Sequence, residues 1–123
     1  MENNIKTFED ACKVLGIGIE VPEVSALPEK HRNAIVAHYK LVIIAQALNE
    51  GWEPDWSNDD EYKYYPWFDM SSGSGSGFSC VDYDYSLSIS SVGSRLCFKS
   101  WKLAKYAGQQ FEDLYKDYFT VIA

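Results

Sequence analysis

Residues 28–51, PEKHRNAIVAHYKLVIIAQALNEG, decide the fold of this 123-residue chain. Pro28 has the backbone angle φ of a first helical position, and Gly51 can take the left-handed conformation that ends a helix. Between them, apolar residues recur at a helical period and cover most sides of the last three turns. Such a helix would span roughly 34 Å at about 1.5 Å per residue. The segment therefore predicts a central helix that is buried on more than one side.

A short helix is predicted before the central one, over about residues 7–15. Thr7 can accept a hydrogen bond from a first-turn N–H, and Gly16 follows the last apolar residue. Residues 17–25 carry Gly, Val and Pro and are typical of a connection.

A third helix is predicted at the C-terminal end. Ser100 is a good N-cap, and apolar residues then recur at helical spacing from Leu103 to Tyr118. Gly108 weakens this helix by about 1 kcal/mol relative to Ala, which indicates close packing at that position.

Three strands are predicted between the helices. Residues 61–68 are aromatic and extended, and Pro66 restricts this strand to an edge or a break. Residues 78–89 alternate between apolar and polar side chains, as in one half-buried strand or a pair of strands. Residues 95–99 are a further candidate. The order α-α-β-β-β-α predicts one α+β domain over residues 1–123, with a small antiparallel sheet packed against three helices.

The tract between the first two strand candidates has low complexity. Residues 71–77 read SSGSGSG and are predicted to form a flexible loop within the single domain.

Composition excludes several classes of protein. The chain has 11 Lys and Arg against 18 Asp and Glu, for a net charge of −7. This charge argues against general nucleic-acid binding, which needs a basic face. The longest apolar run in the central helix, residues 41–45, is too short to cross a membrane. The absence of a signal-like start and the wide spacing of Cys12, Cys80 and Cys97 predict reduced, buried thiols and a cytoplasmic protein.

Seven aromatic residues lie within residues 52–68, interleaved with carboxylates. Flat rings can stack on a nucleobase at about 1–3 kcal/mol each, and carboxylates can accept hydrogen bonds from ribose. The alternative is that these rings mostly pack in the core. The aromatic residues predicted to bind a ligand are Trp52, Trp56, Tyr64, Tyr65 and Trp67.

A basic stretch follows in an otherwise acidic chain. No acidic residue occurs between Asp84 and Glu112, whereas several lysines and one arginine do. Cations near a helix start make sense if an anion occupies that position, held by free backbone N–H groups. The alternative is a solvated face whose lysines pair with acidic neighbours elsewhere. The residues predicted to hold phosphate are Arg95, Lys99, Ser100 and Lys102.

No catalytic, metal-binding or cofactor signature is found in the sequence. His31 and His38 are seven positions apart, which is not the spacing that brings two imidazoles to one metal. Asp82 and Asp84 fit the solvent side of a strand better than a catalytic pair. There is no phosphate-binding P-loop. We therefore expect a protein without enzymatic activity, metal or cofactor.

Three phrases carry a resemblance to a known family: NEGWEPDW at 49–56, EYKYYPWF at 61–68 and GSRLCFKS at 93–100. With the surrounding residues 30–68 and 92–119, they resemble a family of small uncharacterised proteins encoded by gut Bacteroidales phages and related mobile elements. The resemblance implies a phage accessory protein acting in the host cytoplasm, where small phage proteins include inhibitors of host defence. It assigns no functional residue.

These observations lead to a hypothesis with two rivals. The leading hypothesis is a non-enzymatic phage accessory protein that binds and sequesters a phosphorylated, nucleotide-like ligand, such as a host immune signal. A chain this short has little room for a deep pocket, so a site between identical subunits of a homo-oligomer is expected. The rivals are a protein-binding inhibitor that uses the acidic aromatic loop 52–61, and a minor virion or assembly protein.

Overall fold

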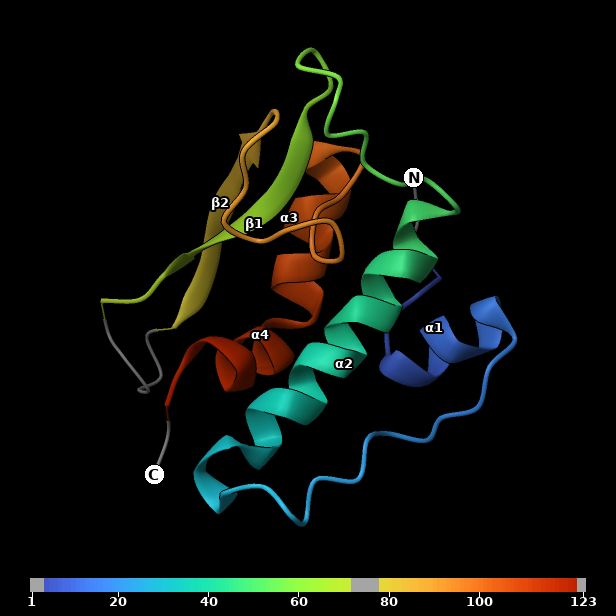
Figure 1. The fold of residues 1–123 in the computed structure, drawn as a ribbon, viewed down its shortest axis with the longest axis vertical. Helices are drawn as coiled ribbons and strands as arrows, with labels where there is room; N and C mark the ends of the chain where they lie inside the picture. Colours follow the sequence, from blue (N-terminus) through green and yellow to red (C-terminus); the bar gives the residue numbers. More distant parts are fainter. Residues whose placement is uncertain (1–3, 72–77, 122–123) are drawn as a thin grey trace.

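The computed structural model describes residues 4–71 and 78–121, which form an α+β fold (Figure 1). In chain order the elements are α1 (Phe8–Leu15), α2 (Glu29–Asn49), β1 (Lys63–Asp69), β2 (Ser79–Ser86), α3 (Trp101–Gln110) and α4 (Glu112–Phe119). The predicted α+β class is confirmed. The predicted three-stranded sheet with three helices is wrong in detail, because the described residues form a two-stranded sheet and four helices. The predicted loop at 71–77 lies outside the described residues except for Ser71.

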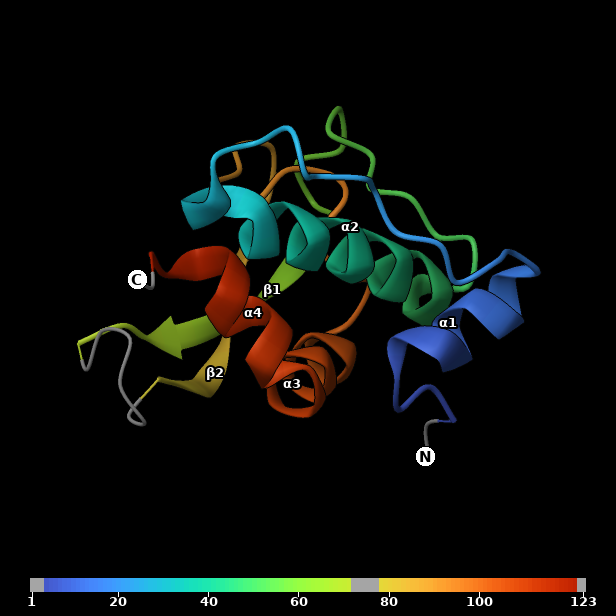
Figure 2. The ribbon, with the colours of Figure 1, turned by 90° about the horizontal axis from the view of Figure 1, so that it is seen from below.

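Helix α2 is the central helix of the fold and is buried on more than one side, as predicted. It lies between α1 on one side and α4 on the other, and the sheet lies beyond α3 and α4 (Figures 1 and 2). Leu41, Ile44 and Leu48 are fully buried along its length. The helix ends one residue before the predicted glycine: Glu50 takes the left-handed conformation with φ of 51°, and Gly51 continues it with φ of 89°.

The local signals for α1 are confirmed. The Thr7 hydroxyl accepts a hydrogen bond of 3.0 Å from the Asp10 N–H, and the Asp10 carboxylate accepts one of 3.2 Å from the Thr7 N–H. This reciprocal cap satisfies backbone donors that a first helical turn leaves free. Gly16 ends the helix with φ of 69°.

The predicted C-terminal helix is broken in two at Phe111, whose φ is −112°. The reason lies in packing: α3 packs on β1 and β2, whereas α4 packs on α2. Because the chain changes direction at Phe111, the apolar residues before it pack on the sheet and those after it pack on α2. The change of direction also buries Phe111 and Tyr115 in the core.

Pro66 explains why the third predicted strand does not form. Phe98 pairs with Tyr64 as an isolated bridge, with hydrogen bonds of 3.0 Å and 2.6 Å in the two directions. The next pair along this edge of β1 would join Leu96 to Pro66, and proline has no N–H to donate. Pairing at residues 95–99 therefore stops after a single rung.

A β-bulge changes which residues of the second predicted strand are buried. The register shifts between Trp67 and Phe68, so Trp67 pairs with Asp82 and Phe68 pairs with Cys80. Val81 is the extra residue, and it is 54% exposed although the alternation predicts it to be buried.

Two aspartates occupy the outer edge of β2. The carboxylates of Asp82 and Asp84 accept hydrogen bonds of 2.9 Å and 2.7 Å from the N–H groups of Tyr83 and Tyr85. These two N–H groups point away from β1. Tyr64, which lies opposite Tyr85, uses its N–H and C=O to bond Phe98, so Tyr64 and Tyr85 are a non-hydrogen-bonded pair. In such a pair the backbone groups of each strand face outward, and Tyr83 is two residues from Tyr85 and has the same orientation. The edge is thus closed to further strand pairing.

All three cysteines are buried free thiols, as predicted. Burial raises the pKa of the Cys97 thiol to about 11. Among the described helices, none combines the length and the apolar character needed to cross a bilayer.

The close packing predicted at Gly108 is present and can be tested. A Cβ at this position would lie 2.4 Å from Cys80 Sγ and 2.7 Å from Pro66 Cβ. We expect Gly108→Ala to lower the free energy of unfolding, because overpacking costs about 1–3 kcal/mol and exceeds the helix-propensity gain of about 1 kcal/mol. Urea denaturation measures the change. The exposed neighbour Gln109→Ala is the control, expected within about 0.5 kcal/mol of wild type. A Gly108→Ala protein as stable as wild type would contradict the packing argument.

Candidate functional site

A cleft with a volume of about 780 Å³ lies where α2 ends. One part of its wall is the last half of α2, which contributes His38 and Gln46. The other parts are the segments 51–54 and 92–95, which contribute Trp52 and Arg95. Two of the residues predicted to bind a ligand therefore meet in one cleft, one aromatic and one cationic.

Asn49 holds the parts of this cleft together. Its side chain is buried, donates a hydrogen bond of 3.0 Å to the Cys97 carbonyl and accepts one of 3.1 Å from the Lys99 N–H. Its own carbonyl accepts a hydrogen bond of 3.0 Å from the Trp52 N–H. The end of α2 is thus joined to the loop that follows it, through Trp52, and to the chain that follows Arg95.

Arg95 is an exposed cation in the wall of the cleft. Its side chain is exposed, and it makes no hydrogen bond or ion pair with any residue in the described part of the chain. Glu53 also lines the cleft, so the wall carries both a cation and a carboxylate. His38 is held by stacking on Tyr118, with 4.9 Å between ring centroids. A guanidinium without a partner is suited to bidentate recognition of phosphate or carboxylate.

Trp56 lies next to Ser94 of the cleft wall, and its side chain already has partners within the chain. Its indole N–H donates a hydrogen bond of 2.6 Å to the Ser94 hydroxyl. The ammonium group of Lys63 makes a cation–π contact with the Trp56 ring, 5.1 Å from the ring centroid. The contact with Ser94 ties the aromatic loop to the cleft wall, so Trp56 has a positioning role.

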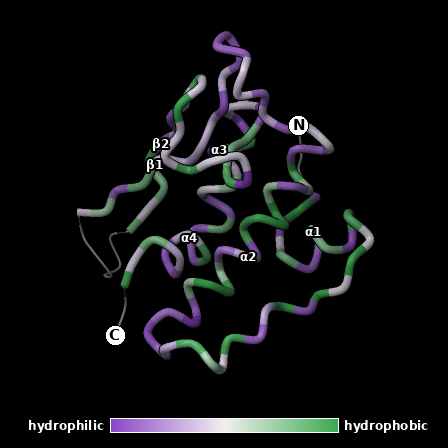
Figure 3. Tube along the Cα trace, viewed as in Figure 1, coloured by the Kyte–Doolittle hydropathy of each residue, from purple (hydrophilic) through white to green (hydrophobic). Residues whose placement is uncertain are grey.

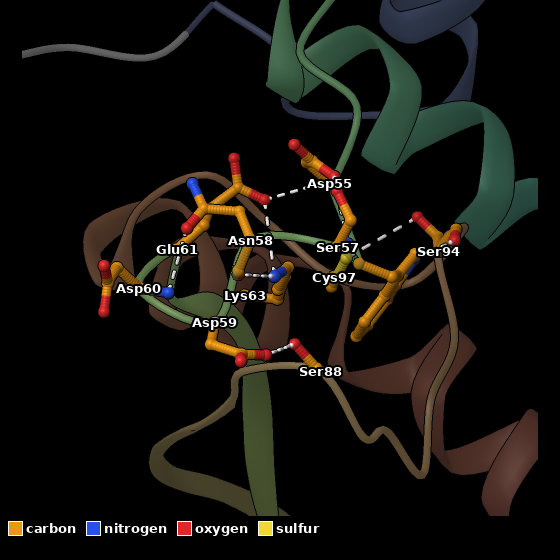
Figure 4. Close-up of polar contacts among 11 residues, drawn as sticks. Asp55, Ser57, Asn58, Asp59, Asp60, Glu61, Lys63, Ser88, Ser94 and Cys97 are labelled. Atoms are coloured by element: carbon orange, nitrogen blue, oxygen red, sulfur yellow. Dashed lines mark hydrogen bonds and ion pairs between the residues drawn. The ribbon is translucent and has the colours of Figure 1, made fainter.

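Lys63 organises the loop of residues 55–61. Its side chain is 0% exposed, and its ammonium donates a hydrogen bond of 3.0 Å to the Asn58 carbonyl. The Glu61 carboxylate forms an ion pair with Lys63 at 3.6 Å and accepts a hydrogen bond of 2.7 Å from the Asp55 N–H. Figure 4 shows the loop folded around this cation.

The carboxylates of the loop are also bound within the chain. Asp55 accepts hydrogen bonds from the N–H and hydroxyl of Ser57, which lower the pKa of its carboxyl. Asp59 accepts a hydrogen bond from the Ser88 hydroxyl. The acidic loop is therefore an internally connected turn structure, with few groups free for a partner.

The remaining aromatic residues lie elsewhere. Tyr64 is on the α3 face of the sheet, in contact with Tyr83 at a centroid distance of 5.6 Å. Tyr65 and Trp67 line a second groove, of about 340 Å³, which shares Val92 with the cleft.

The other predicted phosphate ligands also have partners. Lys99 forms an ion pair of 3.2 Å with Glu50. The Ser100 hydroxyl caps α3 by accepting a hydrogen bond of 3.2 Å from the Leu103 N–H. The Lys102 ammonium lies 5.7 Å from the centroid of the Trp101 ring.

His38 and Gln46 are cleft residues that the sequence analysis did not select. A signal for them exists: His38, Val42 and Gln46 follow one another at intervals of four on a helix, so they share a face.

Within residues 4–71 and 78–121, no three His, Cys, Asp or Glu side chains are grouped as metal ligands.

Comparison of the chain with protein-family models, curated proteins and solved structures yields no match. Functional arguments therefore rest on the geometry of the chain itself.

The role of Lys63 gives a prediction with a matched control. We expect Lys63→Met to lower the free energy of unfolding by about 2–3 kcal/mol, because it removes a buried charge-assisted hydrogen bond and a cation–π contact. Lys99→Met removes the more exposed ion pair and should cost about 1 kcal/mol or less. Urea denaturation followed by tryptophan fluorescence compares the two. Equal losses for both variants would show that Lys63 does not organise the loop.

Proposed function

We propose that this protein binds a small anionic ligand that carries a flat ring, in the manner of a nucleotide, in the cleft at the end of α2. The observation that carries the proposal is that one cleft is lined by Trp52 and by Arg95, which has no ion-pair partner among residues 4–71 and 78–121. The indole would stack on the ring, and the guanidinium would hold the phosphate.

The size and polarity of the cleft agree with this ligand class. Small-molecule sites have volumes of about 300–1,000 Å³ and contain a few polar groups that fix orientation. Besides Arg95, the cleft offers the Gln46 amide and the Glu53 carboxylate, which can contact base edges or ribose hydroxyls.

The biological setting in this proposal is sequestration. No group of residues described above has the arrangement of a nucleophile with its base, so the proposed role is binding without turnover. The resemblance to phage-encoded proteins suggests a host nucleotide signal as the sequestered molecule.

Thermal shift and calorimetry against cyclic nucleotides and ADP-ribose test this proposal. Ligand at a hundred times its Kd stabilises the native state by about 2.7 kcal/mol, which raises Tm by roughly 10 °C for a chain of this size. We expect such a shift for at least one compound, and its loss in Trp52→Ala and Arg95→Gln.

Trp101→Ala and Lys102→Gln are the matched controls, since they remove an aromatic residue and a cation that do not line the cleft. If no compound shifts Tm at high micromolar concentration, or if the controls lose binding equally, the cleft is not the proposed site.

A second candidate function, protein binding, is favoured by the groove that Tyr65 and Trp67 line. Met70, Leu96 and Phe119 complete an apolar floor, and Trp67 projects from it. Asp82 and Asp84 are the cross-strand partners of Trp67 and Tyr65, so carboxylates border the groove. An apolar side chain flanked by lysines or arginines would complement this surface.

We expect a short fluorescein-labelled peptide, with a Leu-Phe-Leu centre flanked by lysines, to bind this groove. Trp67→Ala should weaken binding at least about tenfold, or about 1.4 kcal/mol, because exposed tryptophans are frequent anchors. Fluorescence polarisation measures the affinity, and a peptide with glutamates in place of lysines is the control. Equal binding of both peptides, or unchanged binding by Trp67→Ala, would contradict this assignment.

A further inference from the structure

The connection between α1 and α2 is unusually exposed for a segment rich in isoleucine and valine. It runs along the outside of the molecule beside α2 (Figures 1 and 2), and Figure 3 shows hydrophobic residues spaced along it. Ile17, Ile19 and Val21 are 42%, 60% and 43% exposed. Three exposed apolar residues within five positions make this segment a candidate interaction surface.

The backbone of this segment is also unpaired. Residues 18–23 belong to no helix or strand, and their N–H groups make no hydrogen bond with any described residue. Within the described part of the chain, their carbonyl groups accept no hydrogen bond either. An exposed stretch with free donors and acceptors is a template for strand pairing.

Side chains in the segment alternate as in a strand. Residues 17–21 read IGIEV, so the β-branched residues occupy the odd positions and Gly18 and Glu20 the even ones. β-Branched residues favour strands, and in a strand the odd positions share one face.

We propose that residues 17–21 pair antiparallel with the same segment of a second copy of this chain, about a two-fold axis at Ile19. In this register Ile19 lies opposite Ile19, and Ile17 lies opposite Val21 of the other copy. The apolar residues of both chains then form one continuous face. Symmetry requires that one patch complement itself, and this short sequence does so.

The polar positions agree with the same register. Glu20 lies opposite Gly18, so the carboxylates of the two copies are not directly opposed, which would be destabilising. When the odd residues make the hydrogen bonds, the backbone of even positions faces away from the second copy. Pro22 is at an even position, so its lack of an N–H removes no hydrogen bond between the copies.

The backbone bonds follow from this geometry. The Ile19 N–H donates to the Ile19 carbonyl of the second copy, and the Val21 N–H donates to its Ile17 carbonyl, each with a symmetry equivalent. The Ile17 N–H is not required, and it already donates a hydrogen bond of 3.0 Å to the Cys12 carbonyl. The outer edge of β2 is closed by Asp82 and Asp84, which leaves the 17–21 segment as the better edge for pairing.

Disulfide trapping tests the proposal and its register. Opposed residues in a hydrogen-bonded antiparallel pair have Cα atoms about 5.5 Å apart, which a disulfide can join. We expect Ile19→Cys to form a covalent dimer under mild oxidation. Val21→Cys is the matched control, because its symmetry mates would be roughly 13 Å apart along the strands. A mixture of Ile17→Cys and Val21→Cys proteins should cross-link as a heterodimer. The native cysteines are buried and do not compete.

Sedimentation equilibrium on the unmodified chain gives an independent readout. We expect a mass twice the 14.0 kDa of one chain at high micromolar concentration. Ile19→Lys should be monomeric with an unchanged circular dichroism spectrum, because Ile19 is exposed. A monomeric wild-type chain, or cross-linking of Val21→Cys as fast as that of Ile19→Cys, would overturn the proposal.

Discussion

The buried amide of Asn49 is the interaction on which the arrangement of the site depends. Its two hydrogen bonds, to the Cys97 carbonyl and the Lys99 N–H, join the end of α2 to the segment that precedes α3. Phe98, between these two residues, pairs with Tyr64 and so joins the same segment to the sheet. A buried polar group that loses its partner costs about 1–3 kcal/mol, so this junction is strongly specified. The cleft lies beside it because helix, loop and sheet converge there.

One buried amide, that of Asn49, and one buried ammonium group, that of Lys63, position different parts of this region. Asn49 positions the chain that carries Arg95, and Lys63 gathers the loop that carries Trp56. The hydrogen bond from Trp56 to Ser94 then connects the two parts. The side chains of Trp52 and Arg95 take part in neither network and remain available to a ligand.

Local features of the fold could be predicted from the sequence, and long-range ones could not. The cap at Thr7, the burial of α2 and the packing at Gly108 follow from periodicity, capping and glycine placement, which act within a few residues. The break at Phe111 arises because α3 packs on the sheet and α4 packs on α2, and the periodicity of apolar residues does not show which elements a helix will contact. Pro66 was recognisable as an edge residue, but its effect on the third strand required knowing which residue it would face.

The candidate site was predictable in the same partial way. The aromatic cluster and the basic stretch are the two regions that contribute Trp52 and Arg95 to the cleft. The internal roles of Trp56, Lys99 and Ser100 come from partners 38, 49 and 3 residues away, and only the last of these lies within a helical turn. The full burial of Lys63 has no local signature, because a lysine between tyrosines in a strand is ordinarily solvated.

The most direct test of the central claim is mass spectrometry of the small molecules released from the purified protein, with Arg95→Gln protein prepared in parallel. The account predicts a phosphorylated, ring-containing compound bound to the wild-type chain and absent from the variant. A wild-type chain that carries no such compound, or a variant that carries the same amount, would contradict it.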